Sequence, residues 1–241
     1  MRRGILYRST DLARVPTGAA QTVTALGVRT VFDLRTAGER ELWPETDRLP
    51  AGATYVVADV LRDATGPDRN PGEMVALLAD PARANQLLGG GRGARLFADR
   101  YRDFVRLASA RRAYHRVLAD LAAGGTMPAI VHCTTGKDRT GWLIAVLLLM
   151  LGVPADAVLA DYLASNAELA SLRLEFYEQF AAQGGAPELL EPFMEARSGY
   201  LEIALDEVRR GFGSIEAYLD CGLAIGPRTR RRLADAFVER C

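Results

Sequence analysis

One short stretch of the 241-residue sequence gathers side chains that could do chemistry. Residues 131–142 read VHCTTGKDRTGW, which places Cys133 six residues before Arg139, with Gly136 between them. A cysteine thiolate is a strong nucleophile, and the planar guanidinium of arginine can bind two oxygens of a phosphate group. The spacing therefore indicates nucleophilic attack on a phosphate ester, with the arginine holding the charge that develops.

The same stretch contains the only lysine of the chain. Lysine and arginine together number 30, and every other member of that set is arginine, so Lys137 departs from a strong compositional bias. A lysine ammonium is a compact charge that differs chemically from a guanidinium. Two roles stay open for it: binding a substrate phosphate, or pairing with a nearby carboxylate to hold the loop in shape.

The predicted elements around this stretch would present it at one end of a strand. Residues 125–133 (GTMPAIVHC) are predicted to form a buried strand, and the apolar run after Arg139 is predicted to form a buried helix that ends near Gly152. A glycine-bearing loop that opens a helix points backbone N–H groups at one spot, where the helix dipole also favours an anion. That field favours the thiolate form of Cys133, and the Thr140 hydroxyl could assist the sulfur.

Further strands and helices are predicted on both sides of this unit. Residues 28–34 and 53–60 are β-branched runs typical of strands, residues 97–123 have apolar side chains at helical spacing, and residues 155–241 read as a series of helices. We expect an α/β fold, with a small, mostly parallel central sheet flanked by helices and a helical C-terminal third.

Residues 1–241 are expected to form a single domain. Within it, residues 62–96 are rich in Pro, Gly and Asp at both ends and show only weak helical periodicity between them. We predict that this segment is a loop inserted into the domain, either solvated or acting as a lid.

Composition excludes several classes of protein. The formal net charge is zero, so no bulk field draws the chain to nucleic acid or to an anionic membrane. The longest apolar run, residues 142–155, is too short to span a bilayer. The cysteines at 133, 221 and 241 form no disulfide framework, and no signal-peptide core is visible. We therefore expect a cytoplasmic setting, with secretion by a route without a signal peptide left open.

Two other interpretations of the loop fail on particular residues. GKDRT invites comparison with a nucleotide-binding P-loop, but Val131 stands where the first glycine is required and Asp138 where a Ser or Thr is required. The histidines and cysteines lack the CxxC or HxxxH spacing of a zinc site. We therefore expect no metal and no other cofactor.

The complete loop, HCTTGKDRTG, resembles the Cys-x5-Arg signature of the protein tyrosine phosphatase superfamily. Lysine and aspartate inside the loop make it similar to the bacterial atypical tyrosine/lipid phosphatases, which include a secreted mycobacterial type. Four further segments agree with that family: LYRSTDL (6–12), VFDLRTAGER (31–40), ADYLASNAEL (160–169) and YLEIALDEVRRGFGSIEAYL (200–219). Members usually carry an Asn-Phe-Arg-Asp-like segment before the LYRS stretch. This sequence shows none, so we expect a difference at an edge of the sheet.

The resemblance implies a cysteine-dependent phosphomonoester hydrolase that needs no metal. Cys133 would attack phosphorus and form a cysteinyl-phosphate, which water then hydrolyses, while Arg139 binds the phosphate. The other residues expected to contact the substrate are Thr134, Thr135, Gly136, Lys137 and Thr140. The substrate would be phosphotyrosine protein, with dual specificity as an extension. A phosphoinositide phosphatase and a phosphate-binding module without turnover are the alternatives, and the oligomeric state stays open.

A phosphatase of this kind needs a general acid for the leaving oxygen. Asp138, inside the loop, is the first candidate. Asp59 and Asp63 follow the second predicted strand, where the family tends to have an acidic residue, and for each of them a solvated carboxylate is the alternative. LWPETD at 42–47 invites comparison with the Trp-Pro-Asp loop of tyrosine phosphatases, but Glu45 replaces the aspartate, so we expect a turn there.

The remaining candidates are expected to support the site. His132 should brace the loop through hydrogen bonds rather than transfer protons. Six residues match the family at positions taken as structural: Arg8, Asp33, Arg35, Asp161, Ser165 and Asn166.

Overall fold

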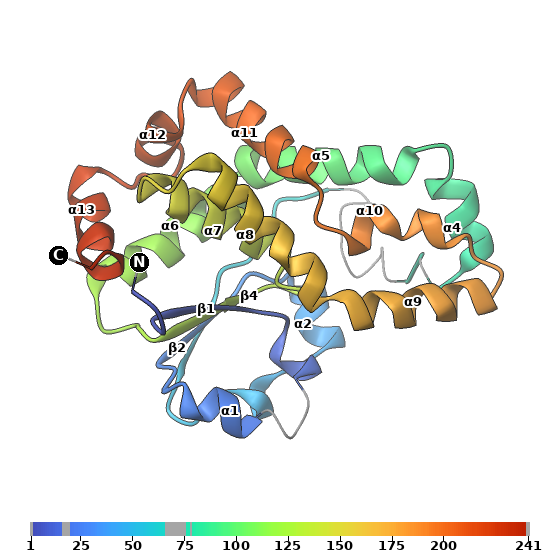
Figure 1. Cartoon of the computed structure of the whole chain (residues 1–241), viewed down its shortest axis with the longest axis horizontal. Helices are drawn as coiled ribbons and strands as arrows, with labels where there is room; N and C mark the ends of the chain where they lie inside the picture. The colour runs from blue at the N-terminus through green and yellow to red at the C-terminus, as the bar shows by residue number, and fades with distance from the viewer. Residues whose placement is uncertain (1, 16–19, 66–75, 78, 240–241) are drawn as a thin grey trace.

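The computed structural model describes residues 2–15, 20–65, 76–77 and 79–239. Its centre is a wholly parallel four-stranded sheet of order β1-β4-β2-β3 (Figure 1). The strands are β1 (Leu6–Ser9), β2 (Thr30–Asp33), β3 (Thr54–Val57) and β4 (Ala129–His132). The predicted strands correspond to β2, β3 and β4. The edge strand β1, which the sequence analysis did not identify as a strand, lies in the LYRSTDL segment.

The helices provide most of the remaining structure. They are α1 (Ala20–Ala25), α2 (Ala37–Leu42), α4 (Pro81–Leu88), α5 (Arg92–Arg106), α6 (Ala108–Ala123), α7 (Arg139–Met150), α8 (Ala155–Glu168), α9 (Ala170–Ala182), α10 (Glu191–Met194), α11 (Ser198–Phe212), α12 (Ile215–Ala217) and α13 (Pro227–Phe237). In Figure 1, α1 lies below the sheet and α6, α7 and α8 lie above it, while α4, α9 and α10 extend to the right.

The two central strands separate two apolar clusters. Because side chains alternate along a strand, Val31 and Ile130 pack into a small cluster on the α1 side, whereas Phe32 and Val131 enter the main core. All four residues of β2 and of β4 are buried, as expected for strands covered on both faces. The expected α/β architecture is confirmed.

The strand register fixes where the functional loop begins. Asp33, at the end of β2, lies opposite His132, at the end of β4, and Ser9 of β1 lies on the other side of His132. The carboxyl ends of parallel strands meet at one edge of a sheet, which is where α/β proteins bind their ligands. The chain leaves β4 at this edge and enters α7, whose residues 139–147 are buried.

The described part of the segment 62–96 is largely helical. It contains α4 and the first turn of α5, while residues 66–75 and 78 lie outside the described residues. Helix α4 begins at Pro81, and the Asp80 side chain accepts a hydrogen bond from Arg83 N at 3.1 Å. This Asp-Pro start is a capping signal that the weak apolar periodicity obscured.

The single helix predicted for residues 97–123 is two helices. Leu107 has an extended backbone (φ −65°, ψ 137°) and divides α5 from α6. No proline or glycine marks this break. Instead Ser109 N donates to Asp63 Oδ2 at 2.7 Å and Ser109 Oγ donates to Val60 O at 2.9 Å. A tertiary contact therefore caps the start of α6, which local periodicity cannot reveal.

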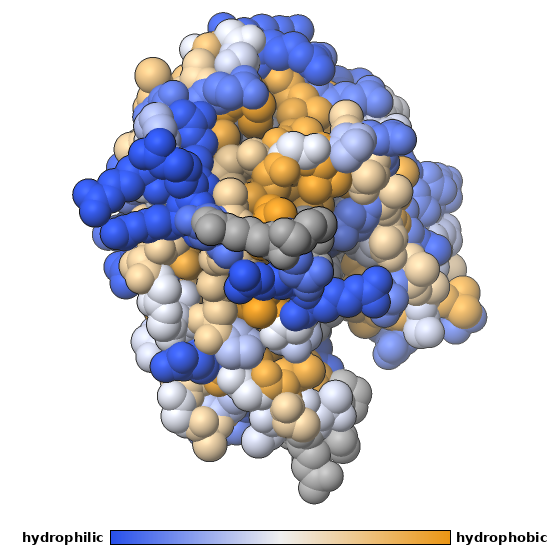
Figure 2. Space-filling model, turned by 60° about the vertical axis from the view of Figure 1, so that its left-hand side comes forward, coloured by the Kyte–Doolittle hydropathy of each residue, from blue (hydrophilic) through white to orange (hydrophobic). Residues whose placement is uncertain are grey.

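The outer surface is mixed in character. On the face drawn in Figure 2, hydrophilic residues form much of the outline and hydrophobic residues show between them in the upper half. Among the described residues, no helix is both long enough and apolar enough to cross a bilayer.

Candidate active site

The loop between β4 and α7 approaches β1 closely. Gly136 has a φ of +66°, and a Cβ at this position would lie 2.3 Å from the Ser9 carbonyl oxygen. Only glycine satisfies both constraints, because other residues rarely adopt this φ and would clash with the backbone. Asp11 N also donates to Thr134 O at 3.2 Å. The loop is thus held against the chain that leaves β1.

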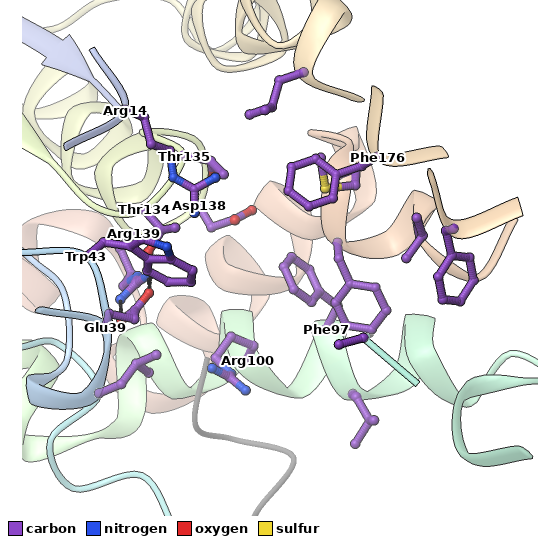
Figure 3. A pocket seen from close by; sticks show the side chains of 18 of the residues that line it. Arg14, Glu39, Trp43, Phe97, Arg100, Thr134, Thr135, Asp138, Arg139 and Phe176 are labelled. Carbon is purple, nitrogen blue, oxygen red and sulfur yellow. Dashed lines mark hydrogen bonds and ion pairs between the residues drawn. The ribbon is translucent and has the colours of Figure 1, made fainter. Parts of the chain in front are cut away.

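A cavity of about 510 Å³ opens over this loop (Figure 3). Its polar end is formed by Glu39 and by the loop residues Thr134, Thr135, Asp138 and Arg139. Its other end is apolar, with walls contributed by α5, α9 and α10: Leu96, Phe97, Leu172, Phe176, Phe180, Leu190, Phe193 and Met194. A polar group and an apolar body of one ligand could therefore be held side by side.

Cys133 begins the loop that joins β4 to α7. It is buried (1% exposed), and the cavity is lined by its loop neighbours Thr134, Thr135, Asp138 and Arg139 rather than by Cys133 itself. It lies within electrostatic reach of the Arg139 guanidinium. The structure therefore brings together the cysteine and the arginine that the sequence spacing selected.

Arg139 is held by a carboxylate that the sequence analysis did not identify. Its Nη1 donates to Glu39 Oε2 and its Nη2 to Glu39 Oε1, both at 2.7 Å, and Nη2 also lies 3.3 Å from Thr134 Oγ1. Burial opposes the charge of Glu39, but Arg139 outweighs that effect and lowers the pKa of the Glu39 carboxyl to about 2. The fork-to-fork pair keeps the guanidinium charged and oriented.

The helix α2 explains how Glu39 reaches this position. Thr36 caps the helix by accepting from Glu39 N, and Glu39 Oε2 in turn accepts from Thr36 N at 2.9 Å, which completes a capping box. The Thr-x-x-Glu pattern in RTAGER is a sequence signal of such a helix start. It predicts the helix, but it could not show that the same carboxylate binds an arginine 100 residues away.

Lys137 is not among the residues that line the cavity. Its side chain is fully buried, and Nζ donates to Asp138 Oδ1 at 2.6 Å and to Glu195 O at 3.3 Å. The ammonium also lies 5.0 Å from the centre of the Phe97 ring. This placement favours the second of the two expected roles, in which the lysine holds the loop, over contact with the substrate.

Asp138 is joined to both sides of the loop. Besides Lys137, the Tyr101 hydroxyl donates to Asp138 Oδ1 at 2.6 Å, and Tyr101 is in turn 2.6 Å from the Tyr162 hydroxyl. Figure 3 shows its carboxylate directed into the cavity. Asp138 Oδ1 therefore already accepts two hydrogen bonds, one from Lys137 and one from Tyr101.

The two other candidate acids occupy different environments. Asp63 caps α6 and pairs with Arg112 at 3.0 Å, so its carboxylate has a structural function. Asp59 is half-buried, accepts from Leu61 N at 3.1 Å and lies within electrostatic reach of Arg139 and Glu39. Burial raises the pKa of Asp59 more than the neighbouring Arg40 and Arg139 lower it.

A second charged cluster lies behind the loop. His132 Nδ1 is 3.1 Å from Cys133 O, and its Nε2 is 3.0 Å from Glu45 Oε1. Arg35 Nη2 lies 2.9 Å from Glu45 Oε1 and 2.8 Å from Asp33 Oδ2. All four side chains are buried. Glu45, which we assigned to a turn, therefore anchors this cluster, and its Oε2 also accepts from Leu12 N at 2.8 Å.

These side chains could be mistaken for a metal site. One ligand atom from each of Asp33, Glu45 and His132 lies within 4.8 Å of the others. However, the Arg35 guanidinium contacts both carboxylates and already supplies the positive charge that a metal would bring. The set therefore fits a protein ion-pair cluster better than a metal.

The remaining predicted residues lie around the loop. Arg8 donates to Gly136 O at 3.1 Å and to Ser165 Oγ at 2.7 Å, and it pairs with Asp161 at 2.8 Å. Asn166 exchanges hydrogen bonds with the backbone of Ala196. The Thr140 hydroxyl is buried and accepts or donates no hydrogen bond among the described residues.

The structure thus places a cysteine directly after a central parallel strand and an arginine in the first turn of the next helix, where that arginine lines the cavity. Comparison with known proteins identifies the class of protein. The profile of the tyrosine phosphatase family matches residues 1–239, and the chain belongs to that family.

Two relatives are similar over most of their length. A putative tyrosine-protein phosphatase of Cupriavidus necator is 31% identical over 226 residues, which are 93% of this chain and 76% of the relative. The triple specificity protein phosphatase PtpB of Mycobacterium tuberculosis is 31% identical over 255 residues, which are 96% of this chain and 91% of the relative. The expected phosphatase-type hydrolase is thus confirmed.

Proposed function

We propose that this protein removes phosphate from phosphotyrosine in proteins through a cysteinyl-phosphate on Cys133. The observation that carries the proposal is the junction of the catalytic loop with the cavity, where Arg139, oriented by Glu39, lines the wall. The Cys133 sulfur would form a bond to phosphorus as the bond to the tyrosine oxygen breaks, and that oxygen takes a proton from an acid. Water then attacks phosphorus and the thiolate leaves, so the acid recovers its proton from the water.

Arg139 would stabilise both steps. The guanidinium is already charged, desolvated and fixed by Glu39 before substrate arrives, so little reorganisation is needed when negative charge develops on the phosphoryl oxygens. The hydroxyls of Thr134 and Thr135 line the same end of the cavity and would contact the phosphate.

We assign the general acid to Asp59 in preference to Asp138. The Asp138 carboxylate already accepts hydrogen bonds from Lys137 and from Tyr101, whereas burial raises the pKa of Asp59 and so favours the protonated form that an acid needs. Asp59 also lies within electrostatic reach of Arg139.

Leaving-group dependence tests this assignment. A general acid matters most when the leaving oxygen is strongly basic, so Asp59→Asn should lower kcat about 100-fold for phosphotyrosine and much less for an ester with an acidic leaving group. The reaction requires the protonated form of Asp59, which is present below its raised pKa and is lost above it. The basic limb of the pH profile of kcat/KM should therefore disappear in that variant. If Asp138→Asn shows both effects instead, Asp138 is the acid.

The apolar end of the cavity favours phosphotyrosine over smaller phosphate esters. Phe97, Phe176 and Phe193 can pack against a phenyl ring, whereas a phosphoserine side chain has no ring for them to contact. A phosphoinositide substrate was suggested by Lys137, but that lysine is buried and paired here.

A reduced thiol at Cys133 also suits the cytoplasmic setting expected from cysteine usage.

Phosphate release in the presence of EDTA tests the function. We expect turnover of a phosphotyrosine peptide, lower turnover of a phosphoserine peptide and of phosphoinositide vesicles, and none by Cys133→Ser. Substrate bound by the wild type without phosphate release would identify a binding module, and a Cys133→Ser protein with wild-type turnover would contradict the proposed nucleophile.

A further inference from the structure

The cavity has a cation at its rim that the catalytic steps do not use. Arg14 ends the short helix η1 (Leu12–Arg14) and lines the cavity together with Thr134 and Thr135. Figure 3 shows its guanidinium on the polar side of the cavity.

This guanidinium is fixed from two directions. Its Nε donates to Asp11 Oδ2 at 2.9 Å, and Asp11 is fully buried. Its flat face lies over the indole of Trp43, with Cζ 4.7 Å from the ring centre. Because Asp11 N also donates to Thr134 O, the arginine keeps a defined position relative to the catalytic loop.

The outer edge of the guanidinium stays available. Within the described part of the chain, the structure assigns hydrogen bonds to the Arg14 backbone N–H and to Nε but none to Nη1 or Nη2, and the side chain is 24% exposed. The two cations of the loop differ from Arg14 because they already contact carboxylates: both terminal nitrogens of Arg139 contact Glu39, and Lys137 contacts Asp138. An oriented, partly desolvated guanidinium with two unassigned donors is suited to bind an oxyanion.

We infer that Arg14 is a specificity-determining residue that binds an acidic side chain close to the phosphotyrosine of the substrate. The inference rests on the proposed phosphotyrosine activity. A peptide whose phosphate occupies the loop has its neighbouring residues at the rim of the cavity, and a carboxylate there would meet the free edge of Arg14. The expected gain is about tenfold in kcat/KM, the usual effect of one charge-assisted hydrogen bond.

The experiment compares two phosphotyrosine peptides that differ only in whether the residues flanking the phosphotyrosine are Glu or Gln. Wild type should prefer the Glu peptide about tenfold in kcat/KM, and Arg14→Gln should reduce this ratio to about one. Arg14→Glu should reverse the preference and favour a peptide with Lys at the same positions. Arg209→Gln, a matched loss of charge on the exposed face of α11, should leave the ratio unchanged.

Three outcomes would overturn the inference: a wild-type ratio near one, a ratio retained in Arg14→Gln, or equal losses for both peptides in that variant. Equal losses would mean that Arg14 only supports Trp43 and the loop. A different result would be that wild type prefers a small ring with two phosphates over the Glu peptide and that Arg14→Gln loses this preference. This result would show that Arg14 binds a second phosphate, and it would also contradict the peptide proposal. If wild type released no phosphate, the proposed function would fail, and the same ratio measured as peptide affinity would still test Arg14.

Discussion

Two clusters of arginine and carboxylate lie against the loop between β4 and α7, and they differ in whether their side chains line the cavity. In front of the loop, Arg139 and Glu39 form a pair that lines the cavity. Behind the loop, Arg35 contacts Asp33 and Glu45, and Glu45 also contacts His132, the residue before Cys133. Every side chain of the rear cluster is buried, and none of them lines the cavity.

The difference shows how one type of interaction can serve two purposes. Burying charged groups costs free energy, and apolar residues often stabilise a protein at least as well. The rear cluster joins the ends of β2 and β4 to the segment around Glu45, so it fixes the position of the loop. The front pair orients the arginine that we propose binds phosphate. We therefore expect rear variants to lose mainly stability, and front variants to lose activity as well as stability.

The largest effect should come from the rear cluster. Arg35→Ala leaves Asp33 and Glu45 as buried carboxylates without their cation, which should lower the free energy of unfolding by about 3–5 kcal/mol. Urea unfolding measures this loss. Arg209→Ala, which removes an exposed arginine, is the control and should change stability by less than about 0.5 kcal/mol. A stable but inactive Arg35→Ala protein would remove the distinction between the clusters.

Acid titration should reveal the front pair in the stability of the protein. The pKa of Glu39 lies at about 2, below the ordinary value of 4.5, so its ion pair stabilises the fold above about pH 4.5 and is lost as the pH falls towards 2. The contribution is on the order of 3 kcal/mol, since one unit of pKa corresponds to about 1.4 kcal/mol.

Single variants would show how much each cluster contributes to this titration. Burial opposes the charge of Asp33, but Arg35 lowers the pKa of its carboxyl to about 2, so the rear cluster contributes over a similar pH range. Unfolding measured between pH 5 and 2.5 should show a shallower loss in Glu39→Gln and in Asp33→Asn than in wild type. A wild-type slope in Glu39→Gln would contradict the assignment of the front pair.

Activity should be most sensitive to the front pair. Glu39→Gln keeps a side chain that can complete the capping box of α2 but removes the charge that orients Arg139. We expect kcat/KM for p-nitrophenyl phosphate to fall about 100-fold, as when one preorganised charge contact to a transition state is lost. A value within threefold of wild type would show that Arg139 does not need the charge of Glu39 to be oriented.

The smallest effect should follow from changing Lys137, the buried lysine of the loop. Lys137→Met keeps the contact with Phe97 but removes the partner of Asp138, so the free energy of unfolding should fall by about 1–2 kcal/mol. Turnover of phosphotyrosine peptide and of phosphoinositide should decrease together. A selective loss of phosphoinositide turnover would assign the lysine to a second substrate phosphate.

Local patterns were sufficient for the central unit of the site. A buried strand, a glycine-bearing loop and a buried helix follow one another within about 30 residues, and hydrophobic periodicity is reliable over such segments. The expected α/β fold and phosphatase class follow from this unit and from the family resemblance. The break between α5 and α6 could not be predicted in the same way, because the contacts that define it come from Val60 and Asp63.

The sequence by itself determined that a cysteine, a glycine and an arginine share one loop, because Cys133, Gly136 and Arg139 are neighbours along the chain. Only the tertiary structure decided which carboxylate orients Arg139 and that Arg14, rather than Lys137, lines the cavity. Glu39 and Arg139 are 100 positions apart, and Lys137 is directed to Glu195 O while Arg14 reaches the rim. The direction of a charged side chain depends on which partners folding brings within hydrogen-bond distance, and that depends on packing rather than on spacing.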